Sequence, residues 1–509
     1  MAVQPIASED HVDVLIVGAG ISGIGVAHYL QKELPSKSYL ILESRQSLGG
    51  TWDLFRYPGI RSDSDLHTYA YEFKPWRSRR AIAGGDEIMA YLREAVAEDG
   101  IDRQIRYGHK VCSAAWSSQD ARWTVEVEML DSGLRKTITC SWLFAASGYY
   151  RYDQGYTPAF PGLERFKGPV VHPQQWPEKL DYRDKRVVII GSGATAVTLL
   201  PALAEQAQHV TMLQRTPTYV VSLPGSDPIA NLFNKVLPAK WAYAATRYKN
   251  VRIQRVSYHL CQTYPNFMRW LIRLGNKKML PDGYPVDVHF KPPYNPWDQR
   301  LCAVPDGDMF KAIKKGKASV VTDHIETFTE TGIRLKSGQE LPADIVVPAT
   351  GFNLQVFGGI EISLDGKPVD MSKCVAFKGM MLSGLPNFAF MIGYTNSSWT
   401  LKVGLVGEHF CRLLAHMDQR GYAVCMPQLP TSDMPTQPLL NFGAGYVQRM
   451  LDHLPRQGTE GAPWIMQMHY LNDIKILRDG PVEDPCLRFE PAGRATTRQP
   501  APARMAMGA

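Results

Sequence analysis

Apolar runs that end at glycine-rich turns set the pattern of this chain. Residues 13–17 (DVLIV) end at GAGISG, a helical pattern follows to about Glu33, and SYLILE then predicts a second strand. This order predicts a βαβ unit with parallel strands. Residues 185–215 repeat it with KRVVII, GSGATA, a helix to about Ala207, and HVTMLQR. Two units about 170 residues apart predict an α/β protein with two doubly wound, Rossmann-like dinucleotide-binding domains.

The remaining patterns place strands and a helical insertion around these units. WTVEVEM and KTITCSWLFAAS alternate like antiparallel strands, while IRLKSGQELPADIVVPATGF predicts a hairpin followed by a buried strand. We therefore expect the first part of one domain at 1–150 and a second domain at 160–345 with a helical insert at about 225–285. The chain then returns to the first domain at 350–490. Residues 491–509 are rich in Pro, Ala and Gly and predict a disordered tail.

Composition narrows the class of protein. A chain of 509 residues exceeds the size of one hydrophobic core, so two or more domains are expected. The N-terminus lacks signal-peptide features, and the best membrane-span candidate, VDVLIVGAGISGIGVAHYL, is better explained by a nucleotide turn. Eight cysteines occur without any CxxC, which argues against a zinc site, a disulfide framework or a redox-active disulfide. We expect no metal and a cytoplasmic location.

The positive charge gathers in one segment. Residues 228–281 contain ten Lys or Arg and no Asp or Glu, within a net charge of +7. The plain interpretation is a solvated helical face. The alternatives are a patch that attracts NADPH phosphates, or weak peripheral contact with anionic lipid at a membrane. No nucleic-acid-binding fold surrounds the segment, so nucleic acid is not an expected partner.

The first glycine motif predicts a nucleotide site that accepts an unphosphorylated ribose. Gly18-x-Gly20-x-x-Gly23 follows a strand and opens a helix, and Glu43 lies twenty residues after Gly23. Glycines let the backbone approach a pyrophosphate at the helix N-terminus, and a carboxylate accepts hydrogen bonds from both ribose hydroxyls. Because the carboxylate would repel a 2′-phosphate, the motif predicts FAD or NAD rather than NADP.

The second motif ends differently. Gly191-x-Gly193-x-x-Ala196 is followed by a strand that ends at Arg215 and Thr216, with no acidic residue. Arginine can form two hydrogen bonds with a 2′-phosphate, which favours NADPH over NADH. A surface arginine is the alternative. One acid-ended and one arginine-ended unit together predict a flavin that NADPH reduces.

A loop directly after the first unit offers further cofactor contacts. In LGGTWDLFRYPGIRSDSD (48–65), two glycines allow a second close approach to a pyrophosphate, and Trp52 offers a flat face. Arg61 and Asp63 bring opposite charges towards the cofactor. A packed loop without function is the alternative, but the position after the first unit favours a flavin-side role.

The stretch FKGPVVHPQQWP (166–177) carries a family resemblance. Its pattern F-x-G-x-x-x-H-x-x-x-W-P resembles the fingerprint of type I Baeyer–Villiger flavin-containing monooxygenases, through Phe166, Gly168, His172, Trp176 and Pro177. Within that family the chain looks closest to the mycobacterial ethionamide-activating subgroup. That likeness rests on GGTWDLFRYPGIRSDSD, GSGATAVTL, YNPWDQRLC, KGMMLSGLPN and GYTNSSWTLK, and it spans roughly residues 12–490.

The resemblance implies an activity. NADPH reduces tightly bound FAD, O₂ adds to give a C4a-peroxyflavin, and this attacks a ketone to yield an ester or lactone. Oxygenation of sulfides or thioamides is an expected side activity, so the partners are small ketone or sulfide substrates. The resemblance also implies that Arg300 stabilises the negative charge and that Asp63 positions it, in agreement with the fixed charge of a guanidinium.

Together with the two motifs, the resemblance assigns cofactor contacts. FAD is expected at Gly18, Gly20, Ser22, Gly23, Glu43, Gly50, Thr51, Trp52, Asp53, Leu54, Asp63 and Val111. NADP is expected at Arg61, Ser62, Asp63, Gly191, Ser192, Gly193, Ala194, Thr195, Ala196, Val197, Arg215 and Thr216. Gln299 stands where many relatives have Lys, which predicts a less strict preference for NADPH.

Within the fingerprint stretch, position argues against direct chemistry. It precedes the second nucleotide unit by fewer than twenty residues, so it joins the two domains. We expect Gly168 and Pro177 to set the chain path, Trp176 to pack, and His172 to hydrogen-bond across the connection. His172 has no Cys, Asp or Glu at ligand spacing, so a metal role is not expected.

Three other functions stay open at this point. One is a flavin monooxygenase whose main substrates are nitrogen or sulfur compounds, since the two nucleotide motifs fit it equally. Another is a flavin reductase or disulfide oxidoreductase, which the missing cysteine pair disfavours. The third is a non-enzymatic protein that binds a surface through residues 228–281.

Overall fold

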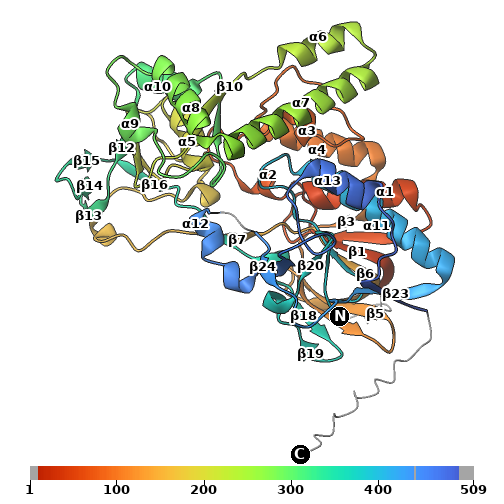
Figure 1. The fold of residues 1–509 in the computed structure, drawn as a ribbon. Helices are drawn as coiled ribbons and strands as arrows, with labels where there is room; N and C mark the ends of the chain where they lie inside the picture. Colours follow the sequence, from red (N-terminus) through yellow and green to blue (C-terminus); the bar gives the residue numbers. More distant parts are fainter. Residues whose placement is uncertain (1–9, 441–442, 492–509) are drawn as a thin grey trace, which may run out of the picture.

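The structure, a computed structural model, describes residues 10–440 and 443–491. Its two largest sheets each contain a glycine-turn βαβ unit, and a group of long helices lies along the top of the molecule (Figure 1). Across the described residues, no helix combines the length and apolarity needed to span a bilayer.

The first sheet is built around the N-terminal βαβ unit. β1 (Asp10–Val17) lies parallel to β2 (Tyr39–Leu42) on one side and to β6 (Arg135–Ala145) on the other. Its order is β19-β18-β4-β5-β6-β1-β2-β3, with β22 (Phe388–Phe390) also parallel to β6. The two predicted alternating strands are β5 (Arg122–Met129) and β6, and they are antiparallel as expected.

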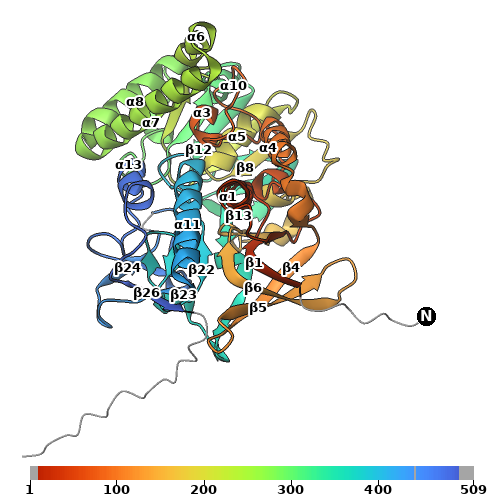
Figure 2. The same cartoon turned by 90° about the vertical axis from the view of Figure 1, so that its right-hand side faces the viewer.

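Helices from both ends of the chain cover one face of this sheet. α1 (Ile21–Glu33) and α11 (Thr400–Arg420) pack against each other beside α4 (Gly85–Asp99) (Figure 2). Their buried side chains, including Val26 and Val403, share a core cluster with Val14 and Ile16 of β1. The C-terminal residues therefore complete the first half, because α11 supplies apolar surface that α1 must bury.

The second sheet is smaller and entirely parallel. Its order is β12 (Ala318–Thr322), β9 (His209–Gln214), β8 (Arg186–Ile190) and β16 (Ile345–Pro348). α5 (Ala194–Leu203) and α10 (Asp308–Lys314) cover one face, and β13 (Ile325–Thr329), β14 (Gly332–Leu335) and β15 (Glu340–Pro342) cover the other. The predicted hairpin and buried strand are β14, β15 and β16. The predicted α/β class with two Rossmann-like parts is thus confirmed.

The chain passes between the halves along two paired strands. β7 (Tyr150–Gly155) leads out of the first half, and β17 (Phe352–Leu354) leads back from the second. They are antiparallel to each other, with Phe352 opposite Gly155 and Leu354 opposite Tyr150. The outgoing and returning segments therefore form one two-stranded connection.

The predicted helical insertion consists of three helices. They are α6 (Pro228–Val236), α7 (Ala239–Thr263) and α8 (Pro265–Met279), followed by α9 (Val286–His289). The insertion lies between β10 (Val220–Leu223) and β11 (Cys302–Pro305), which pair in parallel. Figures 1 and 2 place α6, α7 and α8 at the outer edge of the molecule.

Shorter elements connect these parts. The remaining α-helices of the described residues are α2 (Thr51–Leu54), α3 (Leu66–Tyr69), α12 (Gly445–Gln448) and α13 (Tyr470–Asp473). The remaining strands are β3 (Ile105–Arg106), β4 (His109–Ser117), β18 (Glu361–Leu364), β19 (Lys367–Pro368), β20 (Ala376–Phe377), β21 (Met381–Leu382), β23 (Tyr422–Pro427), β24 (Thr436–Pro438), β25 (Arg456–Gly458) and β26 (Leu487–Pro491).

The end of the chain corrects one prediction. β26 pairs with β23, and Pro491 lies opposite Tyr422. The prediction of disorder from 491 onwards is therefore wrong for Pro491, because this residue completes a strand. Residues 492–509 lie outside the described part of the chain.

Candidate active site

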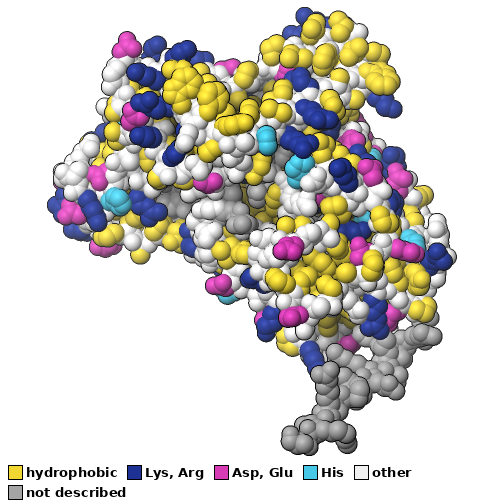
Figure 3. Space-filling model, viewed as in Figure 1, with side chains coloured by type: hydrophobic (Ala, Val, Ile, Leu, Met, Phe, Trp, Pro, Cys, Tyr) yellow, Lys and Arg dark blue, Asp and Glu magenta, His cyan; other side chains and the backbone are white. Residues whose placement is uncertain are grey.

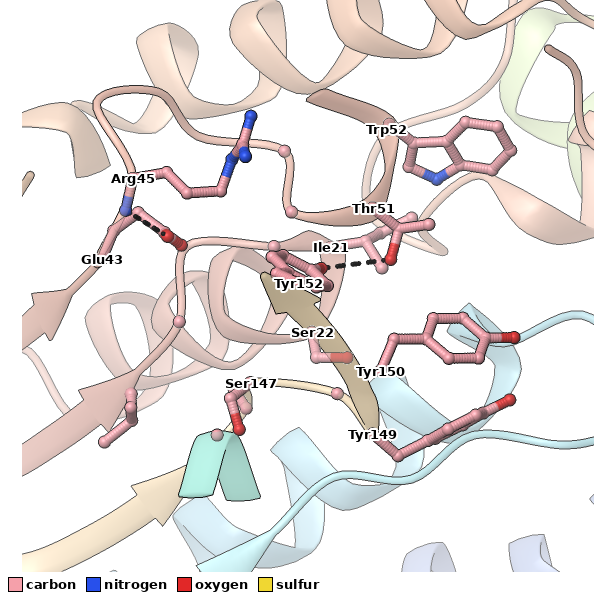
Figure 4. Close-up of a pocket in the computed structure, with 18 of the residues that line it drawn as sticks. Ile21, Ser22, Glu43, Arg45, Thr51, Trp52, Ser147, Tyr149, Tyr150 and Tyr152 are labelled. Carbon is pink, nitrogen blue, oxygen red and sulfur yellow. Dashed lines mark hydrogen bonds between the residues drawn. The ribbon is translucent and has the colours of Figure 1, made fainter. Parts of the chain in front are cut away.

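A cavity of about 670 Å³ opens at the carboxyl ends of β1 and β2 (Figure 4). In open α/β sheets this end of the strands is where ligands bind. Several predicted site residues line it: Gly18, Gly20, Ser22, Glu43, Gly50, Thr51, Trp52, Ser62, Asp63, Val111 and Arg300. The structure therefore brings the first glycine motif, the 48–65 loop and Arg300 to one place.

Three of the residues predicted to contact FAD lie outside this lining: Gly23, Asp53 and Leu54. A Cβ on Gly23 would stand 2.0 Å from the carbonyl oxygen of Gly18, so Gly23 is needed for close packing of the helix on the turn. Asp53 is turned towards Arg45, with 2.5 Å between the carboxylate and the guanidinium, and accepts a hydrogen bond from Ser47. Leu54 packs against the apolar core of the second half.

The turn after β1 leaves backbone open at the cavity. Gly18 has φ +104°, a conformation that favours glycine, and a Cβ on Gly20 would have only the Cα of Gly50 within 4 Å, at 3.8 Å. Helix α1 begins at Ile21, so its N-terminal N–H groups face the same space. Free N–H groups and the helix dipole make such a turn suited to an anionic group.

Glu43 is fixed from beneath by backbone donors. Its Oε2 accepts from the Ala19 N–H at 2.8 Å, and its Oε1 accepts from the Arg45 N–H at 2.9 Å. The residue is buried, and this burial raises the pKa of its carboxyl group. Each carboxylate oxygen can accept more than one hydrogen bond, so Glu43 keeps acceptors for hydroxyls in the cavity.

Arg300 and Asp63 form a two-point ion pair at the cavity. The Nη2 and Nε groups of Arg300 each lie 2.8 Å from a carboxylate oxygen of Asp63. The charge of Asp63 is the main reason that the pKa of Arg300 is raised above its usual value. Trp297, just before Arg300, has φ +74°, a strained conformation for a bulky residue of the kind found at functional sites.

The second glycine motif lies apart from this cavity. Gly191 has φ +134°, and a Cβ there would stand 2.4 Å from the carbonyl oxygen of Ala349. A Cβ on Gly193 would meet no atom within 4 Å, so this backbone is open to approach. The Ser192 hydroxyl donates to the carbonyl of Thr216 at 3.0 Å, which joins the turn to the end of β9, where Arg215 is exposed.

The other predicted residues around this motif divide into two groups. Ala194, Thr195, Ala196 and Val197 form the first turn of α5, with Ala196 and Val197 buried in the core. Arg61 points to Asp308 at the start of α10, with 2.5 Å between guanidinium and carboxylate, whereas Ser62 and Asp63 line the cavity. The segment 61–63 thus runs from the second half to the cavity of the first.

The fingerprint stretch packs at the connection between the halves. Phe166 is buried against the second sheet, and a Cβ on Gly168 would stand 2.4 Å from the carbonyl oxygen of Asp344. Trp176 packs on the core of the second half, and Pro177 follows it on the exposed surface.

His172 lies against the outgoing strand. Its Nδ1 accepts from the Gln174 N–H at 3.1 Å, and its ring fills the space beside Gly155 of β7, where a Cβ would stand 2.1 Å from it. The Gln174 amide donates to the carbonyls of Arg151 and Tyr152 in the same strand. None of the five fingerprint residues lines the cavity.

Several residues that line the cavity were not predicted from the sequence. They include Arg45, Ser147, Tyr149, Tyr152, Tyr394 and Trp399. The Trp399 indole donates to Ser22 at 2.8 Å. The hydroxyls of Tyr152 and Thr51 lie 3.2 Å apart (Figure 4). The one available signal was the position of Ser147, two residues after the end of β6, a neighbour of β1.

Metal ligands do not gather in the described residues. Within 10–440 and 443–491, no group of three or more His, Cys, Asp or Glu side chains is placed to hold an ion.

Two glycine turns of the dinucleotide-binding type thus flank a shared two-stranded connection. The chain belongs to the flavin-binding monooxygenase-like family, which matches residues 82–390. Residues 16–78 also match an NAD(P)-binding Rossmann-like domain. The chain is 55% identical to the FAD-containing monooxygenase EthA of Mycobacterium tuberculosis H37Rv over 481 residues, which cover 94% of this chain and 98% of that one. It is 48% identical to the probable FAD-binding monooxygenase AlmA of Acinetobacter baylyi over 485 residues, which cover 95% and 97%.

Two solved structures share the fold of this chain. An oxidized steroid monooxygenase bound to NADP superposes with a TM-score of 0.73 at 23% identity, covering 94% of this chain and 100% of that one. A cyclohexanone monooxygenase from Rhodococcus sp. Phi1 gives a TM-score of 0.71 at 20% identity, covering 95% and 100%. The chain is therefore a flavin-binding monooxygenase with a two-nucleotide-domain fold, and the predicted family resemblance is confirmed.

Proposed function

We propose that this chain is an FAD-dependent Baeyer–Villiger monooxygenase that consumes NADPH and O₂. It would convert a ketone to an ester or lactone, with NADP⁺ and water as the other products. Oxygenation of sulfides or thioamides at sulfur would be a side activity. The names of the relatives, an FAD-containing and an FAD-binding monooxygenase, support the choice of flavin.

The first cavity suits FAD. The Ser147 hydroxyl is buried there without a hydrogen-bond partner among the described residues, so it is ready to bond a ligand. Open backbone at Gly20 suits a pyrophosphate, and Glu43 is placed to accept from ribose hydroxyls. We assign the FAD-binding part to residues 1–150 and 350–490, with the predicted contacts that line the cavity as its ligands.

The second turn suits NADPH. Open backbone at Gly193 fits a pyrophosphate, and the exposed guanidinium of Arg215 stands beside Thr216, where a 2′-phosphate would lie. We assign residues 160–345 to this cofactor. Its nicotinamide end would reach the cavity past Ser62 and Asp63, since these residues connect the two halves.

The ion pair of Arg300 with Asp63 is the main observation in favour of oxygen insertion beside a carbonyl. Bound FAD, once reduced by NADPH, would react with O₂ and so supply an activated oxygen atom that can attack a carbonyl carbon. Oxygen insertion beside a carbonyl builds negative charge, first on the attacking oxygen and then on the former carbonyl oxygen. Asp63 occupies two donor groups of Arg300, which leaves three N–H donors for that charge. One such donor contributes about 3–4 kcal/mol to the transition state.

A monooxygenase whose main substrates are nitrogen or sulfur compounds is the second candidate. Transfer of oxygen to sulfur leaves no tetrahedral oxyanion on a carbonyl, so it has less need of a fixed cation. The fold relative named for cyclohexanone favours the ketone reaction, and Arg300 gives that preference a physical basis.

Turnover of a ketone panel by purified enzyme tests this proposal. Linear, cyclic and aryl ketones would be compared with sulfides of similar size, and products identified by mass spectrometry. The proposal predicts esters or lactones formed with one NADPH consumed for each. Sulfoxides or N-oxides without any ester from the panel would assign the second candidate instead.

A further inference from the structure

The helical insertion carries an unusual share of exposed apolar surface. Within residues 228–281, which we call the insert surface, Val236, Trp241 and Tyr248 are 65%, 69% and 63% exposed, and Phe267 and Trp270 are 55% and 54% exposed. In Figure 3 these helices present two yellow clusters along the top of the molecule, with dark blue basic side chains around them. Large exposed apolar groups gathered in one segment mark an interaction site.

This exposure does not arise from loosely held helices. The opposite face of α7 is buried, where Tyr243 donates to the carbonyl of Tyr71 at 2.8 Å. The guanidinium of Arg247, also buried, donates to the carbonyls of His67, Thr68 and Ala70 at 3.0–3.2 Å. Because one face is firmly docked, the apolar side chains on the other face are displayed by a rigid scaffold.

The apolar residues follow the helical repeat. On α8, Phe267, Trp270 and Leu271 stand at positions i, i+3 and i+4, and all three are exposed. On α6, Ile229, Leu232 and Val236 occupy i, i+3 and i+7 and are exposed as well. An apolar stripe on the outward face of a surface helix is the pattern of a helix that lies in a lipid interface.

The charges of the insert surface have one sign. Ten Lys or Arg and no Asp or Glu occur in residues 228–281. Six of the ten are exposed and form no ion pair with any residue that the structure describes: Lys235, Lys240, Arg252, Arg255, Lys277 and Lys278. Unpaired cations beside apolar aromatic residues complement a surface that is anionic outside and apolar within.

We infer that α6, α7 and α8 form a surface that binds an anionic lipid bilayer. A solvated helical face would explain the charges but not the exposed tryptophans. A second copy of this chain would bring six unpaired cations against their own equivalents, since a twofold interface pairs a patch with itself. Nucleic acid would meet the charges and stack on aromatic rings, but it gives no burial to Ile229, Leu232 and Val236.

Cosedimentation of the full-length holoenzyme with lipid vesicles tests the inference. Vesicles of phosphatidylcholine alone would be compared with vesicles in which a third of the lipid is phosphatidylglycerol. We expect binding to the anionic vesicles, little to the neutral ones, and a loss at raised salt, because exposed charges are screened. No binding to anionic vesicles, or equal binding to both kinds, would overturn the inference.

Two variants with matched controls locate the surface. The charge variant is Lys235→Gln/Lys240→Gln/Lys277→Gln/Lys278→Gln, and its control makes the same change at four exposed lysines elsewhere: Lys179, Lys185, Lys336 and Lys367. The apolar variant is Trp270→Ser, with the exposed Leu134→Ser as its control. We expect the charge variant to lose at least about tenfold in vesicle affinity and its control less than about twofold. Trp270→Ser should likewise lose more vesicle affinity than Leu134→Ser.

Flavin content, oxygenase turnover and DNA binding are measured with the same variants as further controls. Flavin content and oxygenase turnover without lipid should stay as in the wild type, which shows that each variant is folded. Equal losses in variant and control would overturn the inference, as would tighter binding of a short DNA duplex than of vesicles. Failure of vesicle binding would leave the proposed reaction untouched, because turnover is measured without lipid.

Discussion

The Arg300 guanidinium and the Asp63 carboxylate meet at two points, each 2.8 Å long, across 237 residues of sequence. Asp63 lies in the loop that leaves the first glycine unit, and Arg300 lies two residues before β11 of the second half. The pair thus joins the two halves at the cavity. Its geometry holds a permanent cation beside the site proposed for the flavin while the carboxylate limits the strength of its field.

Removing the carboxylate should misplace the cation rather than abolish it. In Asp63→Asn the amide keeps one acceptor, so Arg300 remains charged but loses its two-point hold. We expect ester formation to fall by about 10- to 100-fold while flavin content stays unchanged. A double-mutant cycle with Arg300→Lys, which keeps the positive charge, measures the coupling: the two losses should be strongly non-additive. Additive losses would show that the two side chains act independently.

Coenzyme choice should depend on Arg215. Arg215→Ala removes the guanidinium proposed to bind the 2′-phosphate, so KM for NADPH should rise by about tenfold or more. KM for NADH should change by less than about twofold, since NADH has no such phosphate. Steady-state kinetics with both coenzymes measures this, with Arg183→Ala as a control because Arg183 is exposed and paired with Asp181. Equal effects on both coenzymes would place 2′-phosphate recognition elsewhere.

Substitution of His172 should lower the share of NADPH oxidation that yields oxygenated product, more than it slows flavin reduction or oxygenation. The His172 ring fills the space beside Gly155 in β7, which pairs with the returning strand β17. In His172→Ala the connection between the two halves loses its packing. The enzyme should then switch less reliably from flavin reduction to oxygenation. We expect near-normal flavin reduction but more hydrogen peroxide released per NADPH. His324→Ala, at an exposed position, is the control. Unchanged coupling would remove His172 from this role.

A buried histidine should make stability depend on pH. His409 in α11 is buried, and its Nδ1 lies 2.8 Å from the Leu477 carbonyl, which fits a neutral ring that donates. Burial, and then the nearby Lys378, lower the pKa of His409 to about 3. Unfolded histidine has a pKa of about 6.5, so the unfolded state takes up the proton first as pH falls.

This shift fixes the sign of the effect. The contribution of His409 is complete above about pH 6.5 and is lost, by about 1.4 kcal/mol per pH unit, as pH falls towards 3. Between pH 7 and pH 5 it accounts for about 2 kcal/mol of lost stability. Urea unfolding at both pH values should therefore show a smaller difference in His409→Gln than in the wild type. The exposed His453→Gln should behave like the wild type, and an unchanged difference in His409→Gln would contradict the assignment.

Local patterns predicted the nucleotide turns because their physical requirements are local. Gly18 and Gly191 both adopt positive φ, and Gly23 must lack a Cβ where helix meets turn. The hairpin of β14 and β15 also follows from a short alternating segment. Such features leave a mark in a few consecutive residues, so reading them needs no knowledge of the rest of the chain.

Several residues that line the cavity could not be predicted from local sequence patterns. Tyr152 comes from the connecting strand β7, Tyr394 follows β22, and Trp399 precedes α11. They reach the cavity because β22 pairs with β6 and α11 packs on α1, contacts made across hundreds of residues. The pairing of Arg300 with Asp63 was likewise expected from family resemblance and not from spacing.

The helical insertion could be predicted from the sequence only in part. Its helices and its positive charge were evident from the sequence, but the choice between a solvated face and a docking surface was not. Only the structure separates Arg247, buried beneath carbonyls of the first half, from Arg252 and Arg255, which are exposed.

Product analysis of Arg300→Ala is the sharpest test of the role proposed for Arg300. The variant would be supplied with NADPH, O₂ and a ketone that the wild-type enzyme converts, with Arg183→Ala as the matched control. We expect bound FAD, reduction of that FAD by NADPH near the wild-type rate, and no detectable ester. Ester formation at the wild-type rate by Arg300→Ala would exclude Arg300 from the oxygenation step.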